Sequence, residues 1–177
     1  MSSREEIFVE YLWGQGGFQE QDIMGKNCLI IGGVYSGGDA YAMGLKARLI
    51  HAGAAQCDTL VLFNPGISDS YCDLTDATAA VGSLSYDLII VLSGMEKTRD
   101  IREGVRQLQE ICHVGGKILV TARTPHDVSS RVSLNTYEDI WRYDADSLAE
   151  LFDRCTVEMS AVDEAYGIVC ALLTRVE

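Results

Sequence analysis

Short apolar runs alternate with helix-like segments along most of the chain. Apolar runs of this length, with few polar positions inside them, predict strands that are buried on both faces. The segments between them carry apolar side chains three and four residues apart, which predicts helices. The strands are expected at 28–31, 59–63, 86–92 and 117–122, and the helices at 40–52 and 98–112. Because strands that alternate with helices are typical of a parallel sheet covered on both faces, the pattern predicts an α/β domain.

The end of the chain follows a different pattern. A short helix is predicted at 146–153, followed by strands at 156–161 and 167–173. The link 162–166 is short enough for an antiparallel pair, so the hairpin is expected to add one antiparallel strand to the sheet.

Two other segments are less regular. The glycine pair at 115–116 is expected to break the preceding helix, and His113 is interpreted as a residue of that helix's C-cap. Residues 67–85 are weakly patterned, with one short helix near 73–78 and a short strand near 70–72 left open.

The N-terminal segment predicts a helix at 3–12 and a glycine-rich aromatic loop at 13–18. Residues 1–25 are therefore interpreted as an N-terminal helix and a lid over the site, and residues 26–177 as the main domain.

The most informative motif is the glycine-rich turn after the first strand. Residues 27–40 read NCLIIGGVYSGGDA, so an apolar strand runs into one glycine pair and a second glycine pair precedes a helix. Glycines let backbone N–H groups approach a ligand, and a helix N-terminus favours negative or polar groups. The strand, turn and helix together predict a nucleotide-type site at the carboxyl end of the sheet.

Three segments together resemble the class I S-adenosylmethionine-dependent methyltransferases. LIIGGVYSGGDA is similar to the family's glycine-rich first motif, YDLIIVLSGMEK to the segment of its fourth strand, and EICHVGGKILVTA to the passage into its fifth. The resemblance covers residues 26–176. It implies a Rossmann-like fold with a seven-stranded, mostly parallel sheet, a C-terminal antiparallel hairpin and helices on both faces. It also implies S-adenosylmethionine as cofactor and methyl transfer to a small molecule.

The resemblance further implies a cofactor pocket at the carboxyl edge of the sheet. The residues that would line it are Gly32, Gly33, Ser36, Gly37, Asn64, Asp76, Ser93 and Met95. Of these, Asn64 would meet the ribose hydroxyls and Asp76 the adenine amino group, while Ser93 and Met95 would face the sulfonium and the substrate. Ile30 and Asn64 stand where the family usually has acidic residues.

Methyl transfer is an in-line displacement that depends on positioning, so no triad is expected. His126 follows the last of the four strands, where a general base could sit, and a surface histidine without a role is the alternative. Glu96 is expected either to contact the substrate or to cap the next helix. Tyr137, Trp141 and Tyr143 form an aromatic cluster that either packs or stacks on a planar substrate.

The net charge of −12 disfavours a broad nucleic-acid surface, because a field of that sign repels phosphate backbones. The exception is a basic group near the start of the helix at 98–112, interpreted as a solvated helix face paired with Glu103 and Glu110. Its members are Lys97, Arg99, Arg102 and Arg106.

The six cysteines have no CxxC spacing, so no metal site is expected, and they are interpreted as reduced structural thiols. Apolar runs are too short for a membrane span and the N-terminus is acidic, so a cytoplasmic protein without a membrane partner is expected. A small-molecule substrate is expected, and the short domain leaves a homo-oligomer or a partner subunit open as a way to complete the pocket.

Two other interpretations stay open. The chain could be a catalytically inactive methyltransferase-like module for binding or assembly. Alternatively, residues 36–39, SGGD, are similar to the pyrophosphate loop of ATP pyrophosphatases, although Ala40 stands where that loop ends in serine.

Overall fold

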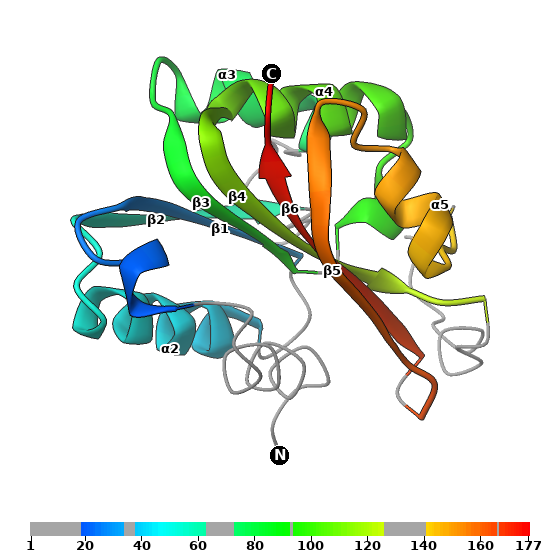
Figure 1. Ribbon diagram of the computed structural model, residues 1–177, viewed down its shortest axis with the longest axis horizontal. Helices are drawn as coiled ribbons and strands as arrows, with labels where there is room; N and C mark the ends of the chain where they lie inside the picture. Colours follow the sequence, from blue (N-terminus) through cyan, green and yellow to red (C-terminus); the bar gives the residue numbers. More distant parts are fainter. Residues whose placement is uncertain (1–18, 34–37, 63–72, 93, 126–140, 166) are drawn as a thin grey trace.

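The computed structural model describes residues 19–33, 38–62, 73–92, 94–125, 141–165 and 167–177. In this part of the chain six strands form one mixed sheet in the order β2-β1-β3-β4-β6-β5. Figure 1 shows α2 against one face of the sheet and α3, α4 and α5 on the other side. The strands are β1 (Asn27–Gly33), β2 (Gln56–Leu62), β3 (Tyr86–Leu92), β4 (Cys112–Arg123), β5 (Cys155–Asp163) and β6 (Ile168–Arg175). The helices are α2 (Gly38–His51), α3 (Ala77–Val81), α4 (Ile101–Ile111) and α5 (Ala145–Glu150), with short 3-10 helices η1 (Glu20–Asp22), η2 (Leu74–Asp76) and η3 (Met95–Lys97).

The apolar runs form strands because each of them has a core on both sides. In β1, Leu29 and Ile31 join the core under α4, whereas Cys28 and Ile30 join the core under α2. All four side chains are buried, since alternate residues of a strand face opposite sides of the sheet. This two-sided burial explains why the strand reads as a continuous apolar run.

The predicted α/β fold is confirmed. β2, β1, β3 and β4 are parallel neighbours, and β6 is antiparallel to both β4 and β5. The C-terminal hairpin adds one antiparallel strand to the sheet, as the sequence predicts, and the structure shows that this second strand lies between β4 and β5. Helices cover both faces, which agrees with the fold that the resemblance implies.

The prediction that the glycine pair at 115–116 breaks the helix is wrong, and so is the C-cap at His113. α4 ends earlier, at Ile111, and β4 begins at the next residue, so the glycines and His113 lie inside β4. The pairing of β3 with β4 skips residues around the glycines, and Gly115 has a φ of 82°. The pair thus serves a β-bulge, in which glycine supplies a backbone conformation that other residues rarely adopt.

Several predicted elements lie outside the described residues, among them the helix at 3–12, the loop at 13–18 and the strand near 70–72. Six strands are described where the resemblance implies seven. The proposed boundary at residue 25 stays a prediction. Next to it, Ile23 is buried in the core under α2 and the N–H of Gly25 donates to the carbonyl of Gly53 at 2.8 Å.

Candidate functional site

The carboxyl ends of the parallel strands meet at one edge of the sheet. Gly33 of β1 is level with Leu62 of β2, Gly32 is level with Leu92 of β3, and Leu92 is level with Thr121 of β4. Because β2 and β3 lie on opposite sides of β1, the chain reverses its strand order here. In open α/β sheets ligands bind outside the carboxyl ends of the strands at such a switch point.

The end of β1 leaves room beside its backbone. A Cβ atom built on Gly32 would meet no heavy atom of the described residues within 4 Å, and the φ of this residue is not in the left-handed region. Gly33 is the last residue of β1. Ser36, Gly37, Asn64, Ser93 and His126 lie outside the described residues, so their predicted roles stay predictions.

The segment after β3 is packed closely against the ends of its neighbours. A Cβ atom on Gly94 would lie 2.6 Å from Cδ1 of Leu62 and 4.0 Å from Cδ1 of Leu74. The contact with Leu74 brings η2, and with it Asp76, to this edge of the sheet. The carboxylate of Asp76 is exposed, and its Oδ2 accepts a hydrogen bond from the N–H of Asp73 at 3.2 Å, which closes the η2 turn. A contact of Asp76 with adenine stays a prediction.

Glu96 is the most deeply buried charged side chain at this edge. Its exposed fraction is 0%, and its Oε1 lies 3.8 Å from Nε of Arg123, whose side chain is 18% exposed. Burying a carboxylate is costly unless a cation or hydrogen-bond donors compensate it, and Arg123 supplies the cation. The helix-capping alternative for Glu96 is wrong, because Asp100 caps α4 by accepting the N–H of Glu103 at 3.1 Å.

Met95, the other predicted site residue of η3, is fully buried in the core under α4. Its carbonyl accepts a hydrogen bond from the hydroxyl of Tyr143 at 3.3 Å. The side chain therefore packs behind the edge, and its predicted contact with the sulfonium is not tested.

Residues 141–143 join η3 to the end of β4. The N–H of Trp141 donates to the carbonyl of Glu96 at 3.0 Å, and its indole Nε1 donates to the carbonyl of Thr98 at 2.8 Å. Two residues further, the N–H of Tyr143 donates to the carbonyl of Arg123 at 3.0 Å. These bonds fix the positions of the two residues that form the buried ion pair.

The aromatic cluster divides into two parts among the described residues. Tyr143 packs in the core, and burial, together with the nearby charge of Glu96, raises the pKa of its hydroxyl. Trp141 remains 39% exposed. The packing alternative is thus confirmed for Tyr143, whereas Tyr137 lies outside the described residues.

Sequence reasoning missed Arg123 and Thr124. Arg123 ends β4, and Thr124 follows it as a buried residue whose Oγ1 makes no hydrogen bond within the described part of the chain. The sequence does contain a signal for Arg123, because Glu96 follows one buried strand and Arg123 ends the next. Neighbouring parallel strands bring residues at such positions close together.

Within the described residues no group of three or more histidine, cysteine, aspartate or glutamate side chains is arranged to hold a metal ion. None of the helices in the described ranges is both long and apolar enough to cross a membrane.

Comparison with known proteins gives structural matches only. No protein-family model matches the sequence, and no curated protein does. An S-adenosylmethionine-dependent methyltransferase from Mesorhizobium loti is similar with a TM-score of 0.64 and 12% identity, over 94% of this chain and 98% of that chain. The N-methyltransferase NodS from Bradyrhizobium japonicum has a TM-score of 0.58 and 11% identity, over 99% and 100% of the two chains. A chain in the Haloferax volcanii complex that contains the methyltransferase activator Trm112 has a TM-score of 0.59 and 12% identity, over 98% and 94%.

These matches extend over nearly the full length of the protein and of the solved chains. The protein therefore has the Rossmann-like fold of the S-adenosylmethionine-dependent methyltransferases, as its sequence motifs predict.

Proposed function

We propose that this protein is an S-adenosylmethionine-dependent methyltransferase that acts on a small molecule. The observation that carries the proposal is the space that the described residues leave beside Gly32, at the switch point where ligands of such sheets bind. A glycine at this position lets a ligand approach the backbone of β1. The net charge of −12 favours a small molecule over a nucleic acid as the acceptor.

The residues fit the cofactor through backbone and small polar groups. Gly32 and Gly33 would line its methionine and ribose side, together with the turn that contains Ser36 and Gly37. Bound S-adenosylmethionine would supply an electrophilic methyl group on a sulfonium. Asn64 and Asp76 would hold its ribose and adenine, and Ser93 would face the reacting centre.

The protein's own contribution is to position the acceptor, because methyl transfer by in-line displacement gains most from orientation. Glu96 lies behind the edge with its charge directed at Arg123, so we assign it a positioning role that holds residues 94–98 in place. His126 remains our candidate for a general base that takes a proton from the acceptor.

The test replaces Gly32 with alanine. The new Cβ meets no atom of the described residues within 4 Å, so the free energy of unfolding is expected to change by less than about 1 kcal/mol. The same methyl group would occupy the space of the cofactor, and the Kd for S-adenosylmethionine or S-adenosylhomocysteine should rise at least about tenfold. Isothermal titration calorimetry measures the Kd, and urea unfolding measures the stability.

Gly44→Ala is the matched control. Gly44 lies in α2, and a Cβ there also meets no atom of the described residues within 4 Å, so this change should leave the Kd as in the wild type. A wild-type protein whose melting temperature does not respond to millimolar S-adenosylmethionine or S-adenosylhomocysteine would overturn the proposal, because a bound ligand must stabilise the native state.

A further inference from the structure

A serine, a histidine and an aspartate lie in hydrogen-bond contact at the amino edge of the sheet. Ser85 directly precedes β3, Asp87 is the second residue of β3, and His113 is the second residue of β4. Nε2 of His113 contacts Oγ of Ser85, and its Nδ1 lies 3.2 Å from Oδ1 of Asp87. The same atoms meet in the Ser-His-Asp triads of hydrolases, where the histidine lies between the hydroxyl and the carboxylate. We call these three residues the Ser85 triad.

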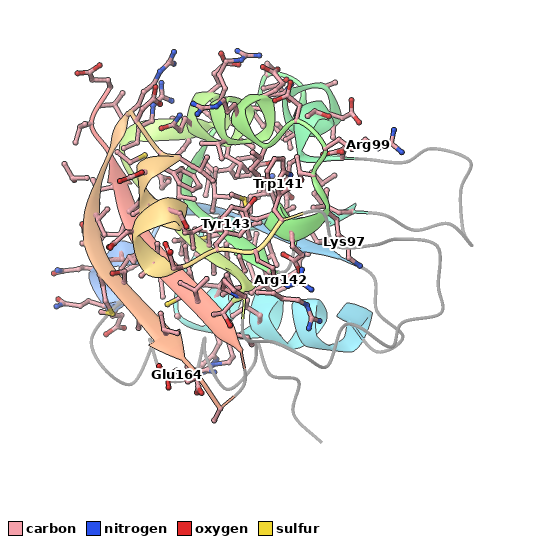
Figure 2. The ribbon with its side chains drawn as sticks, turned by 90° about the vertical axis from the view of Figure 1, so that its right-hand side faces the viewer. Lys97, Arg99, Trp141, Arg142, Tyr143 and Glu164 are labelled. Atoms are coloured by element: carbon pink, nitrogen blue, oxygen red, sulfur yellow. The ribbon has the colours of Figure 1, made fainter. Side chains whose placement is uncertain are left out.

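The Ser85 triad lies at the opposite edge of the sheet from the proposed methyltransferase site. Figure 2 shows Lys97, Trp141 and Tyr143 in one part of the molecule. Backbone hydrogen bonds from Trp141 and Tyr143 attach that part to the segments at the carboxyl ends of β3 and β4. Ser85 and His113 lie instead where the same two strands begin. The triad is therefore separate from the residues that would hold the cofactor.

The bulge at the start of β4 positions His113. The pairing of β3 with β4 places only Asp87 opposite residues 113–116. Gly116 approaches the preceding chain so closely that a Cβ there would lie 2.8 Å from the carbonyl oxygen of His113. Bulges redirect side chains and are frequent next to active sites. In this bulge the ring of His113 reaches Asp87 with one nitrogen and Ser85 with the other.

The hydrogen bonds set the protonation pattern that a nucleophilic serine needs. Burial alone would raise the pKa of Asp87, but hydrogen bonds from Asn27 and His113 outweigh it, so the carboxylate is ionised at neutral pH. An ionised carboxylate only accepts hydrogen bonds, so Nδ1 carries the proton of the neutral ring. Nε2 is then left to accept the hydroxyl proton of Ser85. A histidine held in this tautomer can act as the general base for the hydroxyl.

The Ser85 triad is accessible from solvent and is flanked by apolar side chains. The side chain of His113 is 47% exposed, and Ser85 is half-buried. Leu84, next to Ser85, is 49% exposed, and Val114, next to His113, is 66% exposed. An apolar group that covers such side chains is removed from water, which favours its binding. The flanking residues therefore suit a substrate with an apolar acyl group.

We propose that the Ser85 triad hydrolyses esters that have an apolar acyl group and a good leaving group, an activity separate from methyl transfer. Oγ of Ser85 attacks the acyl carbon while its proton passes to Nε2 of His113. The bond between the acyl carbon and the leaving oxygen then breaks, and His113 returns the proton to that oxygen. Water hydrolyses the acyl-serine with His113 again as the base, which releases the acid and restores the hydroxyl.

Two details of the proposal follow from the surroundings of the triad. Asp87 is a positioning residue, because it acts by keeping His113 in the required tautomer. A good leaving group is needed because a site open to solvent stabilises the oxyanion of the intermediate less than an enclosed one does.

The test measures hydrolysis of 4-nitrophenyl butyrate by the full-length protein. Ser85→Ala should abolish it, and His113→Gln should lower the rate at least about a hundredfold because the general base is lost. Asp87→Asn should lower kcat at least about tenfold and leave KM unchanged, since asparagine favours the wrong tautomer of the ring. A merely structural role of Asp87 would not produce this split.

Phenylmethanesulfonyl fluoride is the second probe. The hydroxyl oxygen of an activated serine forms a bond to its sulfur, and fluoride leaves. Mass spectrometry of the wild-type protein should find this label on Ser85, and the labelled protein should no longer hydrolyse the ester. Because this measurement needs no substitution, it decides the proposal even if a variant fails to fold.

Ser83→Ala is the matched control. Ser83 is an exposed serine two residues before Ser85, and its removal should leave hydrolysis and labelling unchanged. Wild-type hydrolysis in Ser85→Ala, or a sulfonyl label on another residue in place of Ser85, would overturn the proposal. Equal KM values for 4-nitrophenyl acetate and 4-nitrophenyl butyrate would refute the contribution of Leu84 and Val114. S-adenosylhomocysteine should not change the rate of ester hydrolysis, so this proposal and the methyltransferase proposal fail separately.

Discussion

The two edges of the parallel sheet use their polar groups in different ways. At the amino edge, Asp87 of β3 accepts the N–H of Asn27 at 2.9 Å and lies 3.2 Å from Nδ1 of His113, whose other ring nitrogen contacts the hydroxyl of Ser85. These side chains are partly exposed, and they serve as hydrogen-bond partners for one another. At the carboxyl edge the ion pair of Glu96 and Arg123 is buried behind the strand ends.

The glycines show the same difference. At the amino edge, Gly116 is enclosed, and a Cβ there would lie 2.8 Å from the carbonyl oxygen of His113 and 3.0 Å from that of Asp87. At the carboxyl edge, the described residues leave space beside Gly32. The comparison teaches that close contacts hold the strands in register at one edge, whereas at the other edge the described residues enclose the backbone less tightly, on the side where open α/β sheets bind their ligands.

The largest effect is expected from Glu96→Ala. Removing one partner of a buried ion pair leaves the charge of Arg123 poorly compensated, so the free energy of unfolding should fall by about 3 kcal/mol. Urea unfolding measures the loss. Because residues 94–98 hold the edge, S-adenosylmethionine binding should weaken in the variant that remains folded, and Glu96→Gln separates the charge from the volume. If the Glu96→Ala protein were as stable as the wild type and bound S-adenosylmethionine normally, the buried ion pair would no longer distinguish the carboxyl edge from the amino edge.

Gly116→Ala should have the next largest effect. Its methyl group would clash with two carbonyl oxygens, which cannot move without disturbing the pairing of β3 and β4, and the expected loss is about 2 kcal/mol. Since the change lies at the amino edge, calorimetry at a temperature where the variant is folded should give the wild-type Kd for S-adenosylmethionine. A changed Kd would show that the two edges are coupled.

Asp87→Asn should cost about 1 kcal/mol near neutral pH. Burial alone would raise the pKa of Asp87, but hydrogen bonds from Asn27 and His113 and the charge of Lys26 outweigh it and hold the pKa below its usual value. A lowered folded-state pKa adds stability above the unfolded-state pKa of about 3.9, and this stability is lost as the pH falls through the lower, folded-state pKa. The stability difference between wild type and variant should therefore be full at pH 6 and shrink below about pH 4.

Urea midpoints of both proteins from pH 6 to pH 3 provide this measurement. A difference that stays constant down to pH 3 would show that the charge of Asp87 does not stabilise the amino edge.

The sequence was sufficient to predict most of the fold, because the inner strands β1, β3, β4 and β6 are buried on two faces and therefore read as apolar runs. It failed at Gly115 and Gly116, where helix-breaking glycines are equally typical of a bulge and only the pairing of β4 with β3 distinguishes the two. The ion pair of Arg123 with Glu96 was also missed. A charged residue at the end of a strand is usually exposed to solvent, and Glu96 lies in the segment that follows a different strand, β3.

The candidate site is less predictable than the fold for a related reason. Gly32 could be identified because it belongs to the glycine-rich motif at 27–40, whose other residues are adjacent to it in the sequence. The position of Trp141 could not, because it depends on hydrogen bonds from Trp141 to the carbonyl groups of Glu96 and Thr98, which no local pattern reports.

The position of β6 has a consequence for synthesis of the chain. β6 is an inner strand, paired on both sides, yet it is the last of the described strands of this sheet to leave the ribosome. Until it emerges, β4 has an unpaired edge whose apolar residues Ile118 to Val120 can pair with other nascent chains. We expect the sheet to close late in translation and the unfinished chain to depend on chaperones that shield exposed strand edges.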